Sequence, residues 1–171
     1  MAMDISLEAS NIEDKISVVA DEELLYRSIP YTKFYDYIQM ASDGIAISSQ
    51  AFSDRGLKPS VNRATLSNYD PSKTQINHKD GVVSLLASKV RKIDEVNKLS
   101  QHGEAVVVYK IDVIHRPTDT NFAHAQIEPS PEYETKNIFK KLTRSLAFLA
   151  TQRVREHGWE IQPPVDILKS L

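Results

Sequence analysis

The residues best placed for acid–base chemistry are a carboxylate and an imidazole on two predicted strands. Residues 105–114 and 122–128 alternate apolar and polar side chains, and the segment between them is rich in turn formers. Matching the apolar faces of this hairpin sets Asp112 opposite His124, because a slip of one residue would turn every side chain over. A carboxylate in that place can fix the imidazole tautomer for proton transfer. The alternative is an ordinary polar pair across two strands.

The sequence offers no residues for thiol chemistry and no evident set of metal ligands. Cysteine is absent, so disulfides, thiolate nucleophiles and cysteine-containing zinc sites are excluded. His115 and His124 fall on opposite faces of the predicted hairpin, so we expect no metal site there. We expect Asn121 to close the loop by bonding backbone amides. Arg116 and Asn121 are candidates for ligand binding, and no cofactor is expected.

A hydroxyl-rich segment, residues 47–56, follows a short predicted strand. Its serines, Ser48 and Ser49 among them, can contact a ligand, and Arg55 can meet an anion. The alternative is a solvated loop that Phe52 anchors in the core. The chain contains no GxSxG nucleophile elbow, no P-loop and no dinucleotide-binding fingerprint.

Arg27 lies in the middle of an early predicted strand, where apolar neighbours should partly enclose it and a partner should satisfy its charge. Together with a strand that ends in Ser48-Ser49, it resembles the start of ADP-ribosyltransferase folds. The resemblance implies that Arg27 grips NAD, that the serines order the pocket, and that a late glutamate, here Glu128, activates the acceptor. The serine motif departs from the family's usual spacing, and the Gln/Glu-x-Glu turn is absent.

Several short segments within residues 24–150 together resemble a family of small bacterial proteins. These segments are Tyr26-Arg27-Ser28-Ile29-Pro30, Ser48-Ser49-Gln50-Ala51-Phe52-Ser53-Asp54, Pro59-Ser60-Val61-Asn62, His115-Arg116-Pro117 and Asn121-Phe122-Ala123-His124-Ala125. The resemblance implies a bacterial protein of one domain, and it implies no particular activity.

Charge is distributed unevenly along the chain, although the net charge is only −2. Residues 1–24 hold seven acids and one base, whereas residues 136–155 hold six bases and no acid. Four of these bases form a row on a predicted helix: Lys136, Lys140, Lys141 and Arg144. The row predicts a surface for a protein partner or an anion; the alternative is the solvated side of an amphipathic helix. No aromatic residue interleaves with the row, so stacking on single-stranded bases is not expected.

The composition and the periodicity predict one α+β domain. With 171 residues, 41% of them hydrophobic, the chain is long enough to bury a core of its own. We expect an acidic arm over residues 1–20 and a globular domain over 21–171. The expected sheet, small and mixed or antiparallel, uses segments near 24–29, 45–48, 82–86, 105–114 and 122–128. The expected helices, near 31–40, 88–98 and 135–157, cover one face of it. The type of segment 82–98 is left open between one helix and a strand followed by a helix.

These observations favour a non-catalytic binding or accessory module in a bacterial multi-protein system, such as a defence or toxin system, with a protein partner. One alternative is an enzyme that acts on a nucleotide-containing substrate such as NAD. Another is a nucleic-acid-binding protein that uses the basic helix 136–155. There is no apolar run long enough to cross a membrane, and the first residues lack the pattern of a secretory signal. We therefore expect a cytoplasmic protein without a membrane partner.

Overall fold

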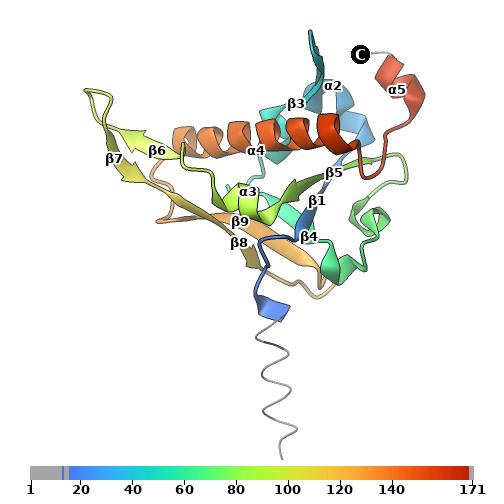
Figure 1. The fold of residues 1–171 in the computed structure, drawn as a ribbon, viewed down its shortest axis with the longest axis horizontal. Helices are drawn as coiled ribbons and strands as arrows, with labels where there is room; N and C mark the ends of the chain where they lie inside the picture. The colour runs from blue at the N-terminus through green and yellow to red at the C-terminus, as the bar shows by residue number, and fades with distance from the viewer. Residues whose placement is uncertain (1–12, 14–15, 170–171) are drawn as a thin grey trace, which may run out of the picture.

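A five-stranded antiparallel sheet in the order β5–β1–β4–β9–β8 forms the centre of the computed structural model (Figure 1). The structure describes residue 13 and residues 16–169, so most of the predicted acidic arm, residues 1–20, lies outside the described residues. The five strands are β1 (Leu24–Ile29), β4 (Ser60–Arg63), β5 (Gly81–Leu86), β8 (Lys110–His115) and β9 (His124–Ser130).

Two small hairpins and several helices complete the fold, which is the predicted α+β class. The hairpin strands are β2 (Ile38–Ala41), β3 (Gly44–Ile47), β6 (Asn97–Leu99) and β7 (Ala105–Val108). The α-helices are α2 (Phe34–Tyr37), α3 (Ala87–Arg91), α4 (Lys136–His157) and α5 (Val165–Lys169). Short 3-10 helices span Tyr31–Lys33, Ser49–Phe52, Thr65–Ser67 and Pro71–Thr74.

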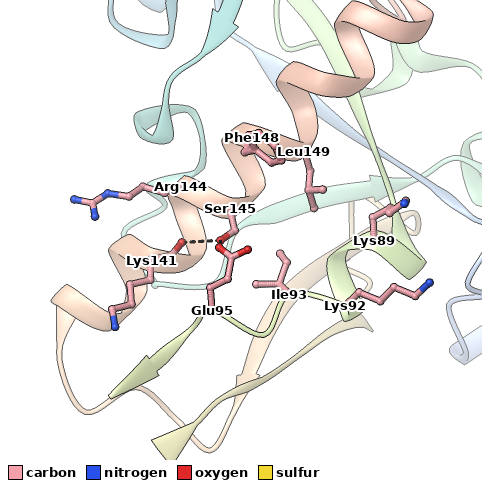
Figure 2. Close-up of a pocket in the computed structure, with 9 residues that line it drawn as sticks. All are labelled: Lys89, Lys92, Ile93, Glu95, Lys141, Arg144, Ser145, Phe148 and Leu149. Atoms are coloured by element: carbon pink, nitrogen blue, oxygen red, sulfur yellow. Dashed lines mark hydrogen bonds between the residues drawn. The ribbon is translucent and has the colours of Figure 1, made fainter. Parts of the chain in front are cut away.

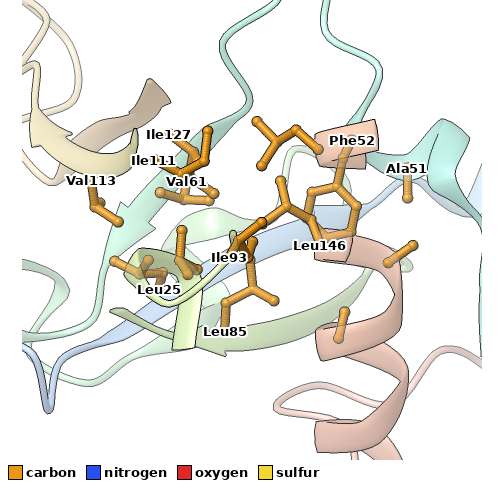
Figure 3. Packing of buried hydrophobic residues seen from close by; sticks show 14 of the residues in the cluster. Leu25, Ala51, Phe52, Val61, Leu85, Ile93, Ile111, Val113, Ile127 and Leu146 are labelled. Carbon is orange, nitrogen blue, oxygen red and sulfur yellow. The ribbon is translucent and has the colours of Figure 1, made fainter. Parts of the chain in front are cut away.

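Helix α4 crosses one face of the sheet and closes the core (Figure 1). Leu142, Leu146 and Ala150 recur every four residues and are fully buried, as the amphipathic pattern predicts. They meet apolar side chains from the sheet and from the 3-10 helix Ser49–Phe52, as Figure 3 shows around Leu146 and Phe52. The helix ends at Gly158, whose φ of 83° is a conformation that favours glycine.

Two predicted helices are shorter in the structure than the sequence suggested. The predicted helix 31–40 turns into strand β2 at Ile38, because Gly44, at φ 120°, lets residues 38–41 fold back on β3. The predicted helix 88–98 ends after α3, and residues 97–99 pair with β7 instead. Segment 82–98 is therefore a strand followed by a short helix. Pairing with a neighbouring strand outweighs local helical spacing in both places.

The β8–β9 hairpin has a different register from the predicted one. Asp112 lies opposite Glu128, four residues beyond His124, and His124 pairs instead with Asn62 on β4. The hairpin continues past the predicted turn, because the backbone N–H of Arg116 donates to the carbonyl of His124 at 3.0 Å. The predicted acid–base pair of Asp112 and His124 is thus not formed.

Strand β9 also runs beyond the predicted segment 122–128 and includes Pro129. The N–H of Ile127 donates to the carbonyl of Pro59, so the N–H groups of the odd-numbered residues of β9 point toward β4. Pro129 follows two residues later, where β4 has no further residue to pair with. Its missing N–H therefore costs the ladder no hydrogen bond.

The C-terminal segment packs against the outer edge of β5. Ile161 forms an antiparallel bridge with Val82, and the ring of Trp159 lies over Gly81. A Cβ at position 81 would meet that ring at 3.0 Å. The close approach of the tryptophan, rather than backbone strain, therefore favours glycine at residue 81.

A buried ion pair joins the end of β4 to the residues before β1. The Nη2 of Arg63 lies 2.9 Å from Oε2 of Glu23, and the two side chains are 4% and 2% exposed. Arg63 also donates to the carbonyl of Val18 at 3.0 Å, and the hydroxyl of Thr65 donates to Glu23. The two charged side chains are removed from water, so the charge of each is stabilised by the other.

Beside this ion pair, His115 provides a test of how acid affects the fold. Its Nδ1 is buried and meets no hydrogen-bond partner among the described residues. Burial first, and then the positive charge of Arg63, lower the pKa of His115 below its usual value of 6.5. The unfolded chain therefore binds the proton more readily than the folded protein, and stability should fall as the pH drops through and below that usual value.

We predict that the variant His115→Gln loses this part of the pH dependence. Denaturant unfolding of the wild type should show a decreasing free energy of unfolding from about pH 7.5 to about pH 5.5. The variant should show a smaller decrease over the same interval. Equal decreases in both proteins would contradict the role assigned to the buried imidazole.

Candidate functional site

A groove lies between α4 and the segment that begins with α3 (Figure 2). Its volume is about 620 Å³. We call it the basic groove. Its lining residues are Lys89, Lys92, Ile93, Glu95, Lys141, Arg144, Ser145, Phe148 and Leu149.

The basic groove combines an apolar floor with cationic walls. Ile93, Phe148 and Leu149 supply the apolar surface, and the Phe148 side chain is conspicuously exposed, at 61%. Four lysine or arginine side chains surround this surface, against one acidic side chain. The acid is Glu95, and its Oε2 accepts a hydrogen bond from the Ser145 hydroxyl at 2.9 Å.

The cations of the basic groove differ in how firmly they are held. The Nζ of Lys141 donates to both the backbone carbonyl and the side-chain oxygen of Asn97, each at 2.7 Å, which fixes one wall. Lys89, Lys92 and Arg144 are exposed. They leave the opposite wall and the rim positively charged and accessible to a ligand.

Only two of the four residues in the predicted basic row line the groove. Lys141 and Arg144 line the basic groove, whereas Lys136 and Lys140 are exposed and lie outside it. The sequence did not indicate the second wall, because residues 89–95 were interpreted as part of one long helix. The spacing of Lys89 and Lys92 with Ile93 was the available signal.

A second hollow, of about 360 Å³, lies over the sheet between β1 and β4. Most of the residues that line it have polar side chains, and we call it the polar cleft. Its lining residues are Tyr26, Arg27, Ser28, Pro30, Tyr37, Asp54, Ser60, Val61, Asn62, Thr74, Ile76, Asn121 and His124. It opens where β1 and β4 diverge, since their pairing is limited to Leu25–Arg63 and Tyr26–Asn62.

Arg27 and Asp54 fill the gap between the diverging strands. The guanidinium, 16% exposed, meets Asp54 Oδ1 at 2.5 Å and donates to the carbonyls of Ala51 and Ser60, both at 2.7 Å. Asp54 in turn accepts the backbone N–H of Ser60 at 2.8 Å. The prediction that Arg27 is enclosed and has a charged partner is confirmed. Its hydrogen bonds hold the backbone in place, and each of its N–H groups already has an acceptor.

Two hydrogen-bonded sets of side chains cross the floor of the polar cleft. Asn121 donates to Asn62 Oδ1 at 2.8 Å, and Asn62 donates to Thr74 Oγ1 at 3.1 Å. His124 Nε2 lies 3.2 Å from the Ser60 hydroxyl, and His124 Nδ1 lies 2.6 Å from the carbonyl of Arg116. Asn121 also accepts the backbone N–H of Ala123 at 3.1 Å, which matches its predicted role in closing the loop.

The remaining predicted site residues lie elsewhere. Asp112 accepts a hydrogen bond from Arg91 at 2.8 Å on the β8 side of the molecule. Glu128 pairs with Arg116 at 2.8 Å, and this guanidinium holds the pKa of the Glu128 carboxyl below its usual range. Ser48 and Ser49 lie beside α4 in a shallow hollow with Arg144 and Arg155. Arg55 is exposed and lines none of these hollows.

The structure therefore brings Arg27, Asn121 and His124 together in the polar cleft, and the other candidates for catalysis lie outside it. Ser60, which the sequence did not single out, joins them from β4. No protein-family model, curated protein or solved structure matches the chain. Over residues 16–169, no helix combines the length and the apolar character needed to cross a membrane. The same residues contain no cluster of three or more histidine, aspartate or glutamate side chains suited to a metal ion.

Proposed function

We propose that the chain is a binding module that holds an acidic segment of a partner protein in the basic groove, as an accessory component of a bacterial multi-protein system. The observation that carries the proposal is the apolar floor of the basic groove with four cations around it. An acidic peptide with one large apolar side chain complements both features. Its side chain would cover Phe148, and its carboxylates would meet the walls.

Protein is the partner that this chemistry favours over nucleic acid. A nucleic-acid site needs a longer continuous cationic track than the four cations of this groove. Phe148 offers a single aromatic face, whereas single-stranded nucleic acids are held by aromatic side chains that stack on successive bases. An exposed aromatic side chain with a charged rim is instead the usual composition of a protein-binding site.

We predict that reversing two charges on opposite walls, Lys92→Glu with Arg144→Glu, weakens binding of an acidic peptide about tenfold. Each reversal replaces an attraction with a repulsion of up to about 1 kcal/mol. The probe is a fluorescein-labelled peptide that alternates glutamate with leucine, and fluorescence anisotropy at low ionic strength gives the Kd. The matched control is Lys136→Glu with Lys140→Glu, which makes the same change in net charge on α4 outside the basic groove.

The control separates a local site from general attraction to a basic helix. Retained affinity in the control and lost affinity in the groove variant support the proposal. Equal losses in both variants would overturn it, and so would tighter binding of a single-stranded oligonucleotide than of the peptide. Phe148→Ala should weaken the leucine-containing peptide and leave a glutamate–serine peptide unchanged, because only the former uses the apolar floor.

A further inference from the structure

The tautomer of His124 follows from its two neighbours in the polar cleft. The carbonyl of Arg116 only accepts hydrogen bonds, so the Nδ1 that lies 2.6 Å away must carry a proton. In the neutral ring, Nε2 is then the bare nitrogen. It faces the Ser60 hydroxyl at 3.2 Å, and this hydroxyl donates to it. A serine, a histidine base and a group that orients the base are the three parts of an activated nucleophile.

Both side chains are held by the sheet and by the ion pair that fills the gap in it. Ser60 and His124 lie on paired strands β4 and β9, on the same face and one diagonal apart. Asp54 binds the backbone N–H of Ser60, and Arg27 binds its carbonyl. The serine therefore has little freedom to move away from the imidazole, which is the positioning that nucleophilic catalysis requires.

The polar cleft also supplies donors for an oxygen that becomes negatively charged. Asn62 and Asn121 line it with Ser60. The amide of Asn62 donates one hydrogen to Thr74, and the amide of Asn121 donates one hydrogen to Asn62. The second hydrogen of each amide is not used by any described residue. Asparagine amides serve as oxyanion donors in acyl transfer.

We propose that Ser60 and His124 form a nucleophile–base pair that cleaves small carboxylic esters in the polar cleft. The Ser60 oxygen bonds to the ester carbonyl carbon while its proton passes to His124 Nε2, and the electrons of the C=O bond move onto the carbonyl oxygen. When the C=O bond re-forms, the bond to the alcohol oxygen breaks, and that oxygen takes the proton from Nε2. Water then releases the acid from Ser60 by the same route, which restores the serine.

The volume of the cleft limits the substrate. About 360 Å³, lined by Tyr26, Tyr37 and the two asparagines, admits a short acyl group and a small alcohol. The orienting group for His124 is a backbone carbonyl rather than a carboxylate, so the imidazolium receives less stabilisation than in a triad with aspartate. Esters with good leaving groups are therefore the class that this pair suits best. The activity goes beyond the proposed binding role and uses no residue of the basic groove.

The test is covalent labelling of the wild-type chain with a fluorophosphonate, located by peptide mass spectrometry, together with turnover of p-nitrophenyl acetate. A single adduct on Ser60 and measurable turnover are expected. Ser60→Ala should abolish both, and His124→Gln should slow labelling about a hundredfold. Ser53→Ala is the matched control, because Ser53 is exposed and its hydroxyl bonds only the carbonyl of Ser49.

Labelling of the wild-type protein alone can overturn the proposal. An adduct on another residue, or no adduct on Ser60, rejects it without any variant. Turnover that survives in Ser60→Ala rejects it as well. Ser60→Cys guards against a variant that fails to fold, because its thiol should react with iodoacetamide faster when His124 is present. The hydrolysis uses no residue of the basic groove and the peptide binding uses none of the polar cleft, so this activity and the binding role fail or succeed separately.

Discussion

Replacing Arg63 with methionine is expected to lower the free energy of unfolding by about 3–5 kcal/mol, because it leaves a carboxylate buried without its counter-charge. Glu23 is 2% exposed and lies 2.9 Å from Arg63, and no other cation bonds it among the described residues. The substitution also removes the donor to the carbonyl of Val18. Denaturant unfolding monitored by circular dichroism at neutral pH measures the loss.

A second substitution at the same site separates the charge effect from lost packing. Glu23→Met combined with Arg63→Met removes both charges and fills similar volume, so the double variant should be more stable than Arg63→Met alone. It should not recover fully, since Thr65 and the carbonyl of Val18 lose their partners. A double variant as unstable as the single one would contradict the assignment of the loss to the unpaired Glu23 carboxylate.

Leu146→Ala is expected to cost about 2–5 kcal/mol, since the side chain is fully buried where α4 meets the sheet. Neighbours on several elements surround it, so they cannot collapse together into the space it leaves (Figure 3). Thermal and denaturant unfolding should both report the decrease. Phe148→Ala, two residues along the same helix, is the matched control because it removes a larger side chain that is mostly exposed.

We expect Phe148→Ala to change the free energy of unfolding by only about 0.5 kcal/mol. A loss comparable to that of Leu146→Ala would show that the apolar floor of the basic groove is part of the core. In that case, the floor would not be a surface available to a partner. The pair of variants therefore links the stability of α4 to the proposed binding role.

Helices and strands with a regular spacing of apolar residues were predictable, because that spacing shows which face of the element is buried. Residues 135–157 carry apolar side chains at helical spacing, and α4 spans Lys136–His157. Residues 24–29 coincide with β1, where Pro30 marks the end of the strand. The α+β class follows from these elements together. Local patterns suffice where one face is buried along the whole element.

The hairpin register could not be read from the pattern. A shift of β9 by four residues against β8 keeps every side chain on the same face of the sheet. The predicted register and the observed one therefore both place apolar side chains opposite apolar side chains. Only the true length of the loop distinguishes them, and Thr118 with Asn121 closes that loop in a way that the turn formers alone do not specify. This is why His124 was assigned to Asp112, when its hydroxyl partner is Ser60.

Both candidate sites depend on residues that are distant in the sequence. Ser60 was missed because β4 has only four residues and no clear alternation, so no strand was predicted there. It is a strand because β1 and β9 lie on either side of it. The basic groove likewise needs residues 89–95 to meet residues 141–149. The local spacing of residues predicts neither the pairing of β4 with its neighbours nor the contact between the two walls of the basic groove.

The strand order also sets when the protein can fold during synthesis. Strand β4 occupies the middle of the sheet, yet one of its neighbours, β9, begins only at His124. The helix that covers the sheet begins later still, at Lys136. A nascent chain of about 120 residues would hold β1, β4 and β5 with their apolar side chains uncovered. The sheet and its core should therefore be completed only after α4 has left the ribosome, and until then the apolar side chains of β1, β4 and β5 remain exposed.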